Sequence, residues 1–393
     1  MEQVTLDTAL AVAAAGGRSL VVSAGGRLEP VLRACGAETI RAPMHSRNPL
    51  TLVANAVRLK RIIESRGVSL VHVRSRAPAF SALWAARAAR VPVIATYHGV
   101  YQARSAPKRW YNAVMTRGDL VLANSIFTRD HILAEHGIDP ARVVVATEGI
   151  DTARFDPLTV SAERVAAIRA AWDLEATDRR PVLLLAARLA GWKGQRLMIE
   201  AMTRLAGPAT PVLILAGKAE KPEEAAALRV LADRAGLGER VRLVGAVNDM
   251  PAAYLAADLV VAPSVLPESF GRSVVEAAAA GRPVLASPLG GPGETIIDGE
   301  TGWLVTAGDS AAWARAVDAA LATPPTALAR MGAAARARAM QRYSLEAMTA
   351  TTFAIYRRLL AKIKATGSRV LESRARLSPL AKLWLAWRTW LRG

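Results

Sequence analysis

Two glutamates stand eight residues apart in the segment PESFGRSVVEAAAAGRPV, which begins at Pro267. Glu268 precedes a helix that we expect to begin near Arg272, and Glu276 lies about one turn inside that helix. Carboxylates accept hydrogen bonds from hydroxyl groups, so Glu268 suits a sugar and Glu276 suits a ribose. Spacing alone, however, favours two unrelated surface carboxylates.

The start of this expected helix is the part of the segment best suited to bind an anion. Phe270 and Gly271 lie where the apolar strand LVVAPS gives way to the helix. Gly271 has no side chain, so the backbone there can approach a ligand closely. The first turn of a helix offers unpaired N–H groups and a partial positive charge, which suit a phosphate or a sugar hydroxyl.

A pair of cations follows another apolar strand, in the segment AARLAGWKGQ. Arg188 stands at the end of the strand, and Lys193 follows five residues later. At the carboxyl edge of one sheet, an arginine fork and a lysine point charge can together neutralise a diphosphate. If that diphosphate is a leaving group, the two cations stabilise the charge that develops on it. On its own, this is a common pattern at a strand end.

His98 ends a third apolar strand and is followed by a glycine. In that place it can hydrogen-bond a sugar hydroxyl or assist charge separation, although a purely structural histidine is the alternative. His72 lies within an apolar run, and we expect it to be packed. The other histidines, which are His45, His131 and His136, show no metal-ligand pattern.

Short apolar runs alternate with helical periodicity in two successive series. The first series lies at residues 19–23, 69–73, 91–98, 119–125 and 142–147. The second lies at residues 181–188, 211–217, 240–246, 259–264, 282–287 and 302–305. This alternation predicts an α/β fold with two doubly wound, Rossmann-like domains, whose ligands bind at the carboxyl ends of the strands across a cleft.

We expect an N-terminal domain at residues 1–157 and a C-terminal domain at residues 158–344. A closing helix at residues 345–365 returns to the first domain, and a basic tail helix occupies residues 366–393. The chain opens on a helix at residues 1–15, whereas a doubly wound domain normally opens with a strand and a glycine loop. We therefore expect the first strand to be missing and the true start to lie upstream of the printed one.

Composition and charge narrow the class of protein. With 52% hydrophobic and 21% charged residues, the chain is globular rather than disordered, and the single Cys35 excludes an internal disulfide. No uncharged run reaches the roughly 18–20 apolar residues that span a bilayer.

The net charge of +18 is confined to two segments. Residues 41–117 carry 14 basic residues and one acidic residue, and residues 366–393 carry six basic residues and one acidic residue. Such a field suits anionic lipid, nucleic acid or an anionic substrate, with a solvated basic face as the alternative.

Six short segments, in this order and at this spacing, resemble glycosyltransferase family 4, whose members are retaining, nucleotide-sugar-dependent enzymes of GT-B fold. The resemblance covers nearly the whole chain, and the combination is specific although no single segment is. The segments are TYHG (96–99), GID (149–151), R-x4-K (188–193), E-x7-E (268–276), GGPGE (290–294) and DGETGWLV (298–305).

The resemblance implies a role for each candidate residue. Arg188 and Lys193 would hold the donor diphosphate, and Glu276 would bind the ribose. Glu268 would touch the donor sugar, and His98 would lie beside the reacting sugar, which makes these two, with the two cations, the catalytic set. The backbone that touches the donor sugar would be that of Ser269, Phe270, Gly271 and Arg272.

The sequence departs from the family at two points. The missing first strand would have carried the glycine-rich loop that approaches the donor phosphates and the acceptor. Glu148 stands before the GID triplet, where the family often has a basic residue, and the sequence offers no physical account of that change. No Asp-x-Asp motif stands at a strand end, so we predict transfer without a metal ion and without any other cofactor.

Two basic segments suit an anionic acceptor or a membrane. In residues 101–118, Arg104, Lys108 and Arg109 alternate with aromatic residues, although an ordinary basic helix explains them equally well. In the tail, apolar residues share one arc of a helical wheel opposite lysine and arginine, which is typical of a helix that lies in a membrane interface. Docking of the tail onto the protein's own core is the alternative. The tryptophans of that arc are Trp384, Trp387 and Trp390.

The sequence therefore predicts a retaining glycosyltransferase that moves a sugar from a UDP- or GDP-sugar to a lipid-linked or lipopolysaccharide-type acceptor. We expect it in the cytoplasm, peripherally bound to the inner face of the cytoplasmic membrane, with no nucleic acid as partner. The leaving diphosphate would take the proton of the acceptor. The alternatives are a degenerate member that binds nucleotide without turnover, and a nucleic-acid-binding protein, which would leave the paired glutamates unexplained.

Overall fold

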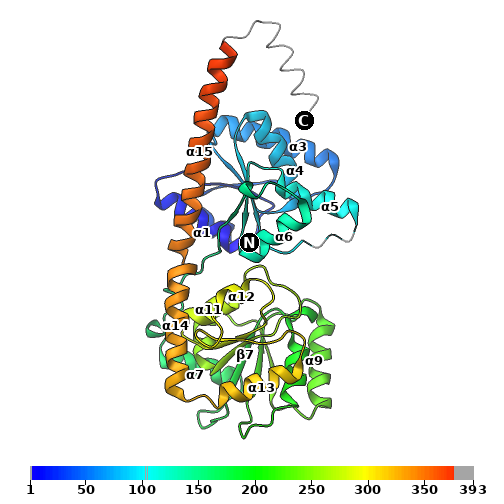
Figure 1. Cartoon of the computed structure of the whole chain (residues 1–393), viewed down its shortest axis with the longest axis vertical. Helices are drawn as coiled ribbons and strands as arrows, with labels where there is room; N and C mark the ends of the chain where they lie inside the picture. The colour runs from blue at the N-terminus through cyan, green and yellow to red at the C-terminus, as the bar shows by residue number, and fades with distance from the viewer. Residues whose placement is uncertain (1, 102, 104, 376–393) are drawn as a thin grey trace.

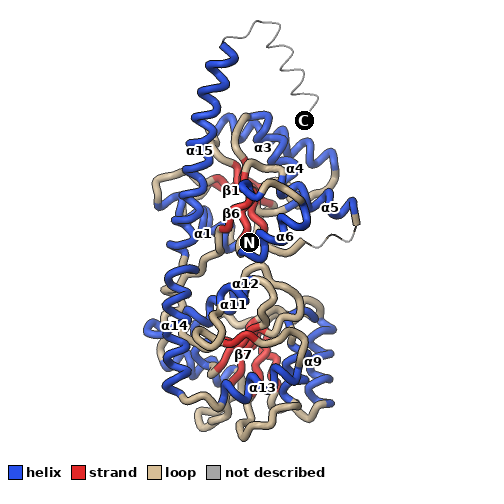
Figure 2. The backbone as a smooth tube through the Cα atoms, in the orientation of Figure 1, coloured by secondary structure: helices blue, strands red, loops and turns tan. Residues whose placement is uncertain are grey.

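The computed structural model describes residues 2–101, 103 and 105–375, and of residues 363–375 it describes the backbone alone. The chain folds into two α/β halves that lie one above the other in Figure 1, the N-terminal half in blue and cyan and the C-terminal half in green and yellow. Strands lie at the centre of each half with helices around them (Figure 2). Two halves built on parallel sheets are what the two series of apolar runs predict.

The C-terminal half contains one parallel sheet of six strands in the order β12-β11-β10-β7-β8-β9. Its central strand β7 has the sequence VLLLA, and its side chains alternate between two apolar cores, with Leu184 in one and Leu183 in the other. Burial on both faces explains why the strand is apolar throughout. The strands are β7 (Val182–Ala186), β8 (Val212–Ala216), β9 (Val241–Gly245), β10 (Leu259–Ala262), β11 (Val284–Ala286) and β12 (Trp303–Leu304).

Helices cover both faces of this sheet. Fully buried Tyr254 packs into the core on one face, and fully buried Trp313 packs into the core on the other. Aspartates hold two of the helix starts, because the side chains of Asp249 and Asp309 accept hydrogen bonds from backbone N–H groups. The helices are α7 (Ala162–Ala171), α8 (Gln195–Met202), α9 (Pro222–Arg234), α10 (Met250–Ala256), α11 (Arg272–Ala279), α12 (Gly291–Thr295), α13 (Ser310–Leu321) and α14 (Pro325–Tyr343).

The N-terminal half contains a parallel sheet of four strands in the order β3-β4-β5-β6 and a separate parallel pair, β1-β2. The sequence did not predict β2, because its residues ETIR contain a single apolar side chain and the strand is held by backbone pairing with β1. The strands are β1 (Leu20–Ser23), β2 (Glu38–Arg41), β3 (Val71–Val73), β4 (Val93–Tyr97), β5 (Leu120–Ala123) and β6 (Val143–Val145).

Helices also flank the N-terminal sheets, and the first of them occupies the segment expected to be helical. The start and end of α3 follow from its sequence: the Asn48 side chain accepts hydrogen bonds from two backbone N–H groups, and Gly67 ends the helix at φ 62°. The helices are α1 (Glu2–Ala14), α2 (Glu29–Ala34), α3 (Pro49–Arg66), α4 (Arg76–Ala89), α5 (Ala106–Asn112) and α6 (Ile126–His136).

The last helix, α15 (Leu345–Ala375), leaves the C-terminal half and runs along the N-terminal half (Figure 1). Its Ile355 and Leu359 pack with Ile94 of β4 and Leu122 of β5. His72 is packed as expected: its two ring nitrogens lie 2.6 Å from the hydroxyls of Tyr356 and Thr96. The helix continues to Ala375, ten residues beyond the expected end at residue 365.

The chain crosses between the halves at two places that touch each other. The Ile150 N–H donates to the Tyr343 carbonyl at 2.8 Å, and the Leu345 N–H donates back to the Ile150 carbonyl at 3.0 Å. Gly149 fits tightly there, because a Cβ on it would lie 2.6 Å from the Ser344 carbonyl oxygen. The GID segment is thus fastened to the start of α15.

Over the described part of the chain, no helix is both long enough and apolar enough to cross a membrane.

Candidate active site

The loop between β10 and α11 is bent into a shape that requires glycine. Gly271 precedes the first residue of α11 and has φ 80°, a backbone conformation that side chains disfavour. A Cβ at this position would also lie 2.7 Å from Cγ of Pro292. The preceding Phe270 is buried and packs edge-on against Tyr343, with ring centroids 5.8 Å apart. The start of α11 is therefore held in place with its amides at the carboxyl end of β10.

The glycine-rich GGPGE segment braces this loop from the other side. The Glu268 N–H donates to the Leu289 carbonyl at 3.1 Å, and the Gly291 N–H donates to the Glu268 carbonyl at 2.8 Å. The two backbones lie so close that a Cβ on Gly290 would stand 2.0 Å from the Glu268 carbonyl oxygen. Sequence spacing does not show this contact, which fixes the direction of the Glu268 side chain.

Lys193 and Glu268 form an ion pair at the carboxyl ends of β7 and β10. Lys193 Nζ lies 2.8 Å from Glu268 Oε1, and the two side chains are only 14% and 11% exposed. The Ser264 hydroxyl donates to the same carboxylate oxygen. The lysine also lies over the Trp192 ring, 4.3 Å from its centroid. A largely desolvated cation and a carboxylate thus stand side by side.

The other two donor-site candidates have partners of their own. Arg188 is 60% exposed and pairs with Glu220 at 3.4 Å, and no contact joins it to Lys193 in the described residues. Glu276 accepts from Arg272 Nε at 2.8 Å and from the Tyr254 hydroxyl at 3.1 Å. Burial raises the pKa of Tyr254, so its hydroxyl keeps its proton and donates it. Lys193 and Glu268 therefore contact each other, whereas Arg188 and Glu276 contact other partners.

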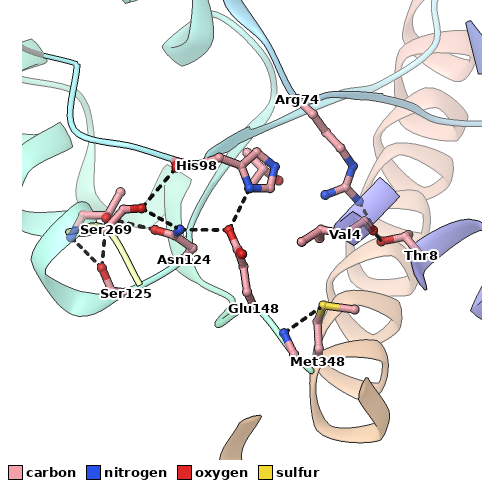
Figure 3. A network of polar contacts seen from close by, with 12 residues as sticks. Val4, Thr8, Arg74, His98, Asn124, Ser125, Glu148, Ser269 and Met348 are labelled. Atoms are coloured by element: carbon pink, nitrogen blue, oxygen red, sulfur yellow. Dashed lines mark hydrogen bonds and ion pairs between the residues drawn. The ribbon is translucent and has the colours of Figure 1, made fainter. Parts of the chain in front are cut away.

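Side chains from both halves meet at Ser269. Its hydroxyl donates to the carbonyl oxygen of His98 at 3.1 Å and accepts from Asn124 Nδ2 at 3.2 Å (Figure 3). Glu294 of α12 reaches across as well, and its carboxylate accepts from the backbone N–H groups of Ile126 and Phe127 at 2.9 and 2.7 Å. These two N–H groups start α6, so a carboxylate of one half caps a helix of the other.

His98 forms a buried pair with Glu148, the residue for which the sequence offered no account. His98 Nδ1 lies 2.9 Å from Glu148 Oε1, and the side chains are 8% and 13% exposed. Burial lowers the pKa of His98, and Glu148 offsets this only in part. Burial also opposes ionisation of Glu148, but hydrogen bonds from His98 and Asn124 outweigh it and lower the pKa of Glu148 to about 2. The pair therefore consists of a neutral imidazole and a carboxylate.

Sequence reasoning missed several polar residues at the ends of the N-terminal strands. Asn124 follows β5 and donates to Glu148 Oε1 at 3.0 Å. Arg74 follows β3 and donates to the Thr8 hydroxyl at 2.8 Å, and burial lowers its pKa. The signal was available, since Arg74 directly follows the predicted run at residues 69–73 and Asn124 lies near the end of the predicted run at residues 119–125. What the sequence lacked was the order of the strands, which brings these ends together.

The basic segment at residues 101–118 lies partly in α5. Lys108 and Arg109 are both exposed; Lys108 lies 5.7 Å from the Tyr111 ring centroid, and Arg109 pairs with Glu135 at 3.1 Å. Arg109, Glu135 and Trp110 line an open pocket of about 310 Å³. The remaining residues expected to face an acceptor or a membrane, which are Arg104, Trp384, Trp387 and Trp390, lie outside the described residues.

The part of the chain that the structure describes holds no group of three or more His, Cys, Asp and Glu side chains arranged to bind a metal ion. Transfer without a metal ion stays a prediction.

Comparison with known proteins agrees with this geometry. Residues 169–338 match the glycosyl transferases group 1, and residues 1–154 match glycosyltransferase family 4. The crystal structure of a glycosyltransferase from Rickettsia africae ESF-5 superposes with a TM-score of 0.84 at 28% identity, over 91% of this chain and 94% of that one. The structure of HepE from Anabaena, solved in complex with UDP and glucose, superposes with a TM-score of 0.77 at 23% identity, over 90% of this chain and 95% of that one.

Curated relatives match over shorter stretches. The D-inositol 3-phosphate glycosyltransferase of Mycobacterium sp. (strain KMS) is 36% identical over 171 residues, which is 42% of this chain and 37% of the relative. The phosphatidyl-myo-inositol mannosyltransferase of Mycobacterium leprae is 40% identical over 137 residues, 34% of this chain and 35% of the relative. The chain thus spans little more than a third of the length of these relatives. Together with the two superposed structures, the family matches over both halves show that the chain belongs to glycosyltransferase family 4 and has the GT-B fold.

Proposed function

We propose that this protein is a retaining glycosyltransferase that moves a sugar from a nucleotide diphosphate sugar to an anionic acceptor. The observation that carries the proposal is the buried Lys193–Glu268 pair beside the amides at the start of α11. The cation and the amides suit a diphosphate, and the carboxylate suits the hydroxyls of the attached sugar. Ser269 connects this point to His98 in the other half, where an acceptor would enter.

We assign the donor to the C-terminal half, residues 158–344, and the acceptor to the N-terminal half, residues 1–157. The donor is a UDP- or GDP-sugar. The HepE structure, which contains UDP and glucose, shares the fold and so supports a nucleotide sugar as the donor. Arg188 stands at the end of β7 with its side chain 60% exposed, which leaves its guanidinium free to turn from Glu220 to a phosphate.

In the proposed reaction, the bond between the donor sugar carbon and the diphosphate oxygen breaks, and a bond to the acceptor oxygen forms on the same face. The leaving diphosphate takes the proton of the acceptor hydroxyl. Lys193 and the α11 amides stabilise the charge that develops on the diphosphate, so a divalent ion is not needed for that task. Activity that a chelator abolishes and magnesium or manganese restores would contradict this part of the proposal.

The proposed acceptor is a lipid-linked or lipopolysaccharide-type glycan that carries phosphate or carboxylate. Residues 41–117 supply a surplus of 13 positive charges in the N-terminal half. Two relatives are named for acting on D-inositol 3-phosphate and phosphatidyl-myo-inositol, and both names include a phosphate. The same surplus would hold the protein to the anionic inner face of the cytoplasmic membrane.

A two-stage experiment tests the donor half of this proposal. Purified full-length protein is first screened by thermal melting against UDP- and GDP-sugars, because a ligand that binds the folded state raises the melting temperature. Transfer of labelled sugar from the best donor to anionic lipid acceptors is then measured for the wild type and for Glu268→Gln. If no nucleotide sugar raises the melting temperature, the proposal is rejected. If a nucleotide sugar raises the melting temperature but its sugar is transferred to none of the acceptors, the result favours a protein that only binds nucleotide.

A further inference from the structure

Glu148 is placed to control which ring nitrogen of His98 carries the proton. We propose that Glu148 is a positioning residue that holds His98 in the Nδ1-protonated form, so that Nε2 presents a lone pair to a hydroxyl group of the sugar substrate. The inference rests on the proposed function, because it names the chemistry that the His98 side chain offers there. It predicts a sugar with a hydroxyl, rather than a carboxylate, at the carbon facing His98.

The first step of the argument is the direction of the His98–Glu148 hydrogen bond. The 2.9 Å contact joins Nδ1 to Glu148 Oε1, and an ionised carboxylate can only accept. Nδ1 must therefore be the donor, and it carries the proton. Burial favours the neutral ring, and Arg74, which faces the ring from β3, also disfavours a second positive charge. A neutral ring protonated at Nδ1 has its lone pair on Nε2.

Neighbouring side chains also determine that Glu148 accepts, rather than donates, a hydrogen bond. The Ser125 hydroxyl donates to the Thr128 hydroxyl at 2.9 Å, and Thr128 in turn donates to Asn124 Oδ1 at 3.0 Å. Since Oδ1 accepts, the group that Asn124 turns to Glu148 is its Nδ2, which donates at 3.0 Å. Glu148 thus receives two hydrogen bonds on one oxygen (Figure 3). Glu148 Oε1 therefore accepts from both neighbours, which favours the ionised carboxylate and leaves Nδ1 of His98 as the donor.

The backbone on the far side of Glu148 is equally constrained. The Gly149 N–H donates to Met348 Sδ at 3.2 Å, and the next residue is bonded to both sides of the crossing to α15. The carboxylate is therefore anchored by its own chain as well as by Asn124. This double support is what a residue needs if it is to orient a neighbour rather than follow it.

The other ring nitrogen shows what the substrate must supply. His98 Nε2 is buried and has no hydrogen-bond partner among the described residues. A buried acceptor without a partner is costly, so a donor placed there recovers free energy. The His98 carbonyl accepts a hydrogen bond from Ser269, so His98 adjoins the loop that would hold the sugar. A hydroxyl can donate to Nε2, whereas a carboxylate cannot donate and would be repelled by Glu148.

The tautomer can be measured directly by nitrogen NMR of full-length protein labelled with ¹⁵N-histidine, with His98 assigned by the signal lost in His98→Asn. We expect Nδ1 protonated and Nε2 unprotonated in the wild type. Glu148→Gln keeps an acceptor oxygen and should keep this pattern, whereas Glu148→Leu should give a mixture of tautomers. A wild-type His98 protonated at Nε2 alone would overturn the inference, and this result does not depend on whether either Glu148 variant folds.

Kinetics with the donor found by melting provide the second readout. Glu148→Leu should lower kcat/KM about 10-fold to 100-fold, and Glu148→Gln should stay within about threefold of wild type. Glu64→Leu, on the exposed face of α3, serves as the control and should leave kcat/KM unchanged. A donor whose hydroxyl facing His98 is replaced by hydrogen should lose rate in the wild type and little in Glu148→Leu. Equal losses in both proteins would contradict the inference.

The two proposals fail in distinguishable ways. If no sugar is transferred from any donor while the tautomer is as expected, the proposed function is wrong and the Glu148–His98 geometry is right. If transfer proceeds while His98 has the opposite tautomer, the role of Glu148 is wrong and the proposed function holds.

Discussion

The two halves of this molecule use their positive charges in different ways. In the C-terminal half, cations stand against carboxylates, as Lys193 does at 2.8 Å from Glu268 and Arg272 does at 2.8 Å from Glu276. The N-terminal half also has ion pairs, but several of its cations stand over aromatic rings, as Arg76 does at 4.2 Å from the Tyr101 ring centroid, and residues 41–117 carry a surplus of 13 positive charges. Charges neutralised in pairs act at one point, whereas a surplus acts as a field over a surface.

This contrast predicts few, large effects in the C-terminal half and many small, salt-dependent effects in the N-terminal half. The substitutions below follow from it, in order of decreasing effect.

Lys193→Ala should cause the largest loss, because it removes a desolvated cation from the place where the leaving diphosphate develops charge. By analogy with the loss of one preorganised donor in other active sites, kcat should fall about 10² to 10³-fold. The measurement is the initial rate of sugar transfer at saturating donor, with melting temperature checked in parallel. Arg204→Ala, which removes an exposed cation just beyond the end of α8, is the matched control. A fall smaller than about threefold would remove Lys193 from the mechanism.

The double variant Lys108→Gln, Arg109→Gln should weaken binding to vesicles that contain anionic lipid. Each cation near such a surface contributes about 1 kcal/mol, so the pair should cost about 2 kcal/mol, or about 30-fold in affinity. The loss should shrink as salt rises. Arg330→Gln, in α14 of the C-terminal half, removes an exposed charge outside the basic segment. If Arg330→Gln weakens vesicle binding as much per charge, the charge surplus of the N-terminal half has no special part in it.

Glu294→Ala tests whether Glu294 holds the two halves together in addition to capping α6. The change removes the acceptor of two backbone N–H groups at the start of α6, and it should lower the free energy of unfolding by about 1 kcal/mol in urea titration. Asp309→Ala removes a cap of the same kind inside the C-terminal half and should cost a similar amount. Only Glu294→Ala should raise the radius of gyration in solution X-ray scattering. An equal rise in both variants would show that Glu294 does not hold the halves together.

Glu148→Gln should have the smallest effect on transfer, within about threefold of the wild type, and its effect on stability should depend on pH. The pKa of Glu148 is lowered from its ordinary value of 4.5 to about 2, so the stabilisation from its charge is complete above pH 4.5. It is lost as the pH falls from 4.5 toward 2. The difference in free energy of unfolding between the wild type and Glu148→Gln should be constant above about pH 7.5, where His98 is neutral in the folded and the unfolded protein, and it should shrink below pH 4.5. A difference that does not shrink below pH 4.5 would mean that the carboxylate is not held ionised by its neighbours.

The sequence predicted the fold well because the strands carry its strongest pattern. Runs such as VLLLA are apolar at every position, and only a strand buried on both faces needs that. The strand ETIR escaped prediction because it is short, polar and held by backbone pairing. The family was also correctly predicted, since six spaced segments constrain it together. The domain boundaries and the roles of the site residues stay predictions.

The site was less accessible to sequence reasoning, and the reason is geometric. Lys193 and Glu268 are 75 residues apart, but both follow strands that end at the same edge of the sheet. His98 and Glu148 follow β4 and β6, so the sequence shows two strand ends and not their contact. The sequence showed that Glu148 departs from the family pattern, but it did not show that Glu148 contacts His98. Spacing identifies candidate residues, and strand order decides which of them meet.

The touching crossings at Ile150 and the start of α15 limit how the two halves can move. Both connecting segments pass through one point and are bonded to each other there, and Gly149 leaves no room for them to slip. Sliding of one half over the other would break both bonds, whereas rotation about this pivot would keep them. Because α15 is packed on the N-terminal half, the helix must rotate together with that half. Opening of the two halves then requires Ser269 to part from His98 and Glu294 to part from α6, while the two backbone bonds at Ile150 are kept.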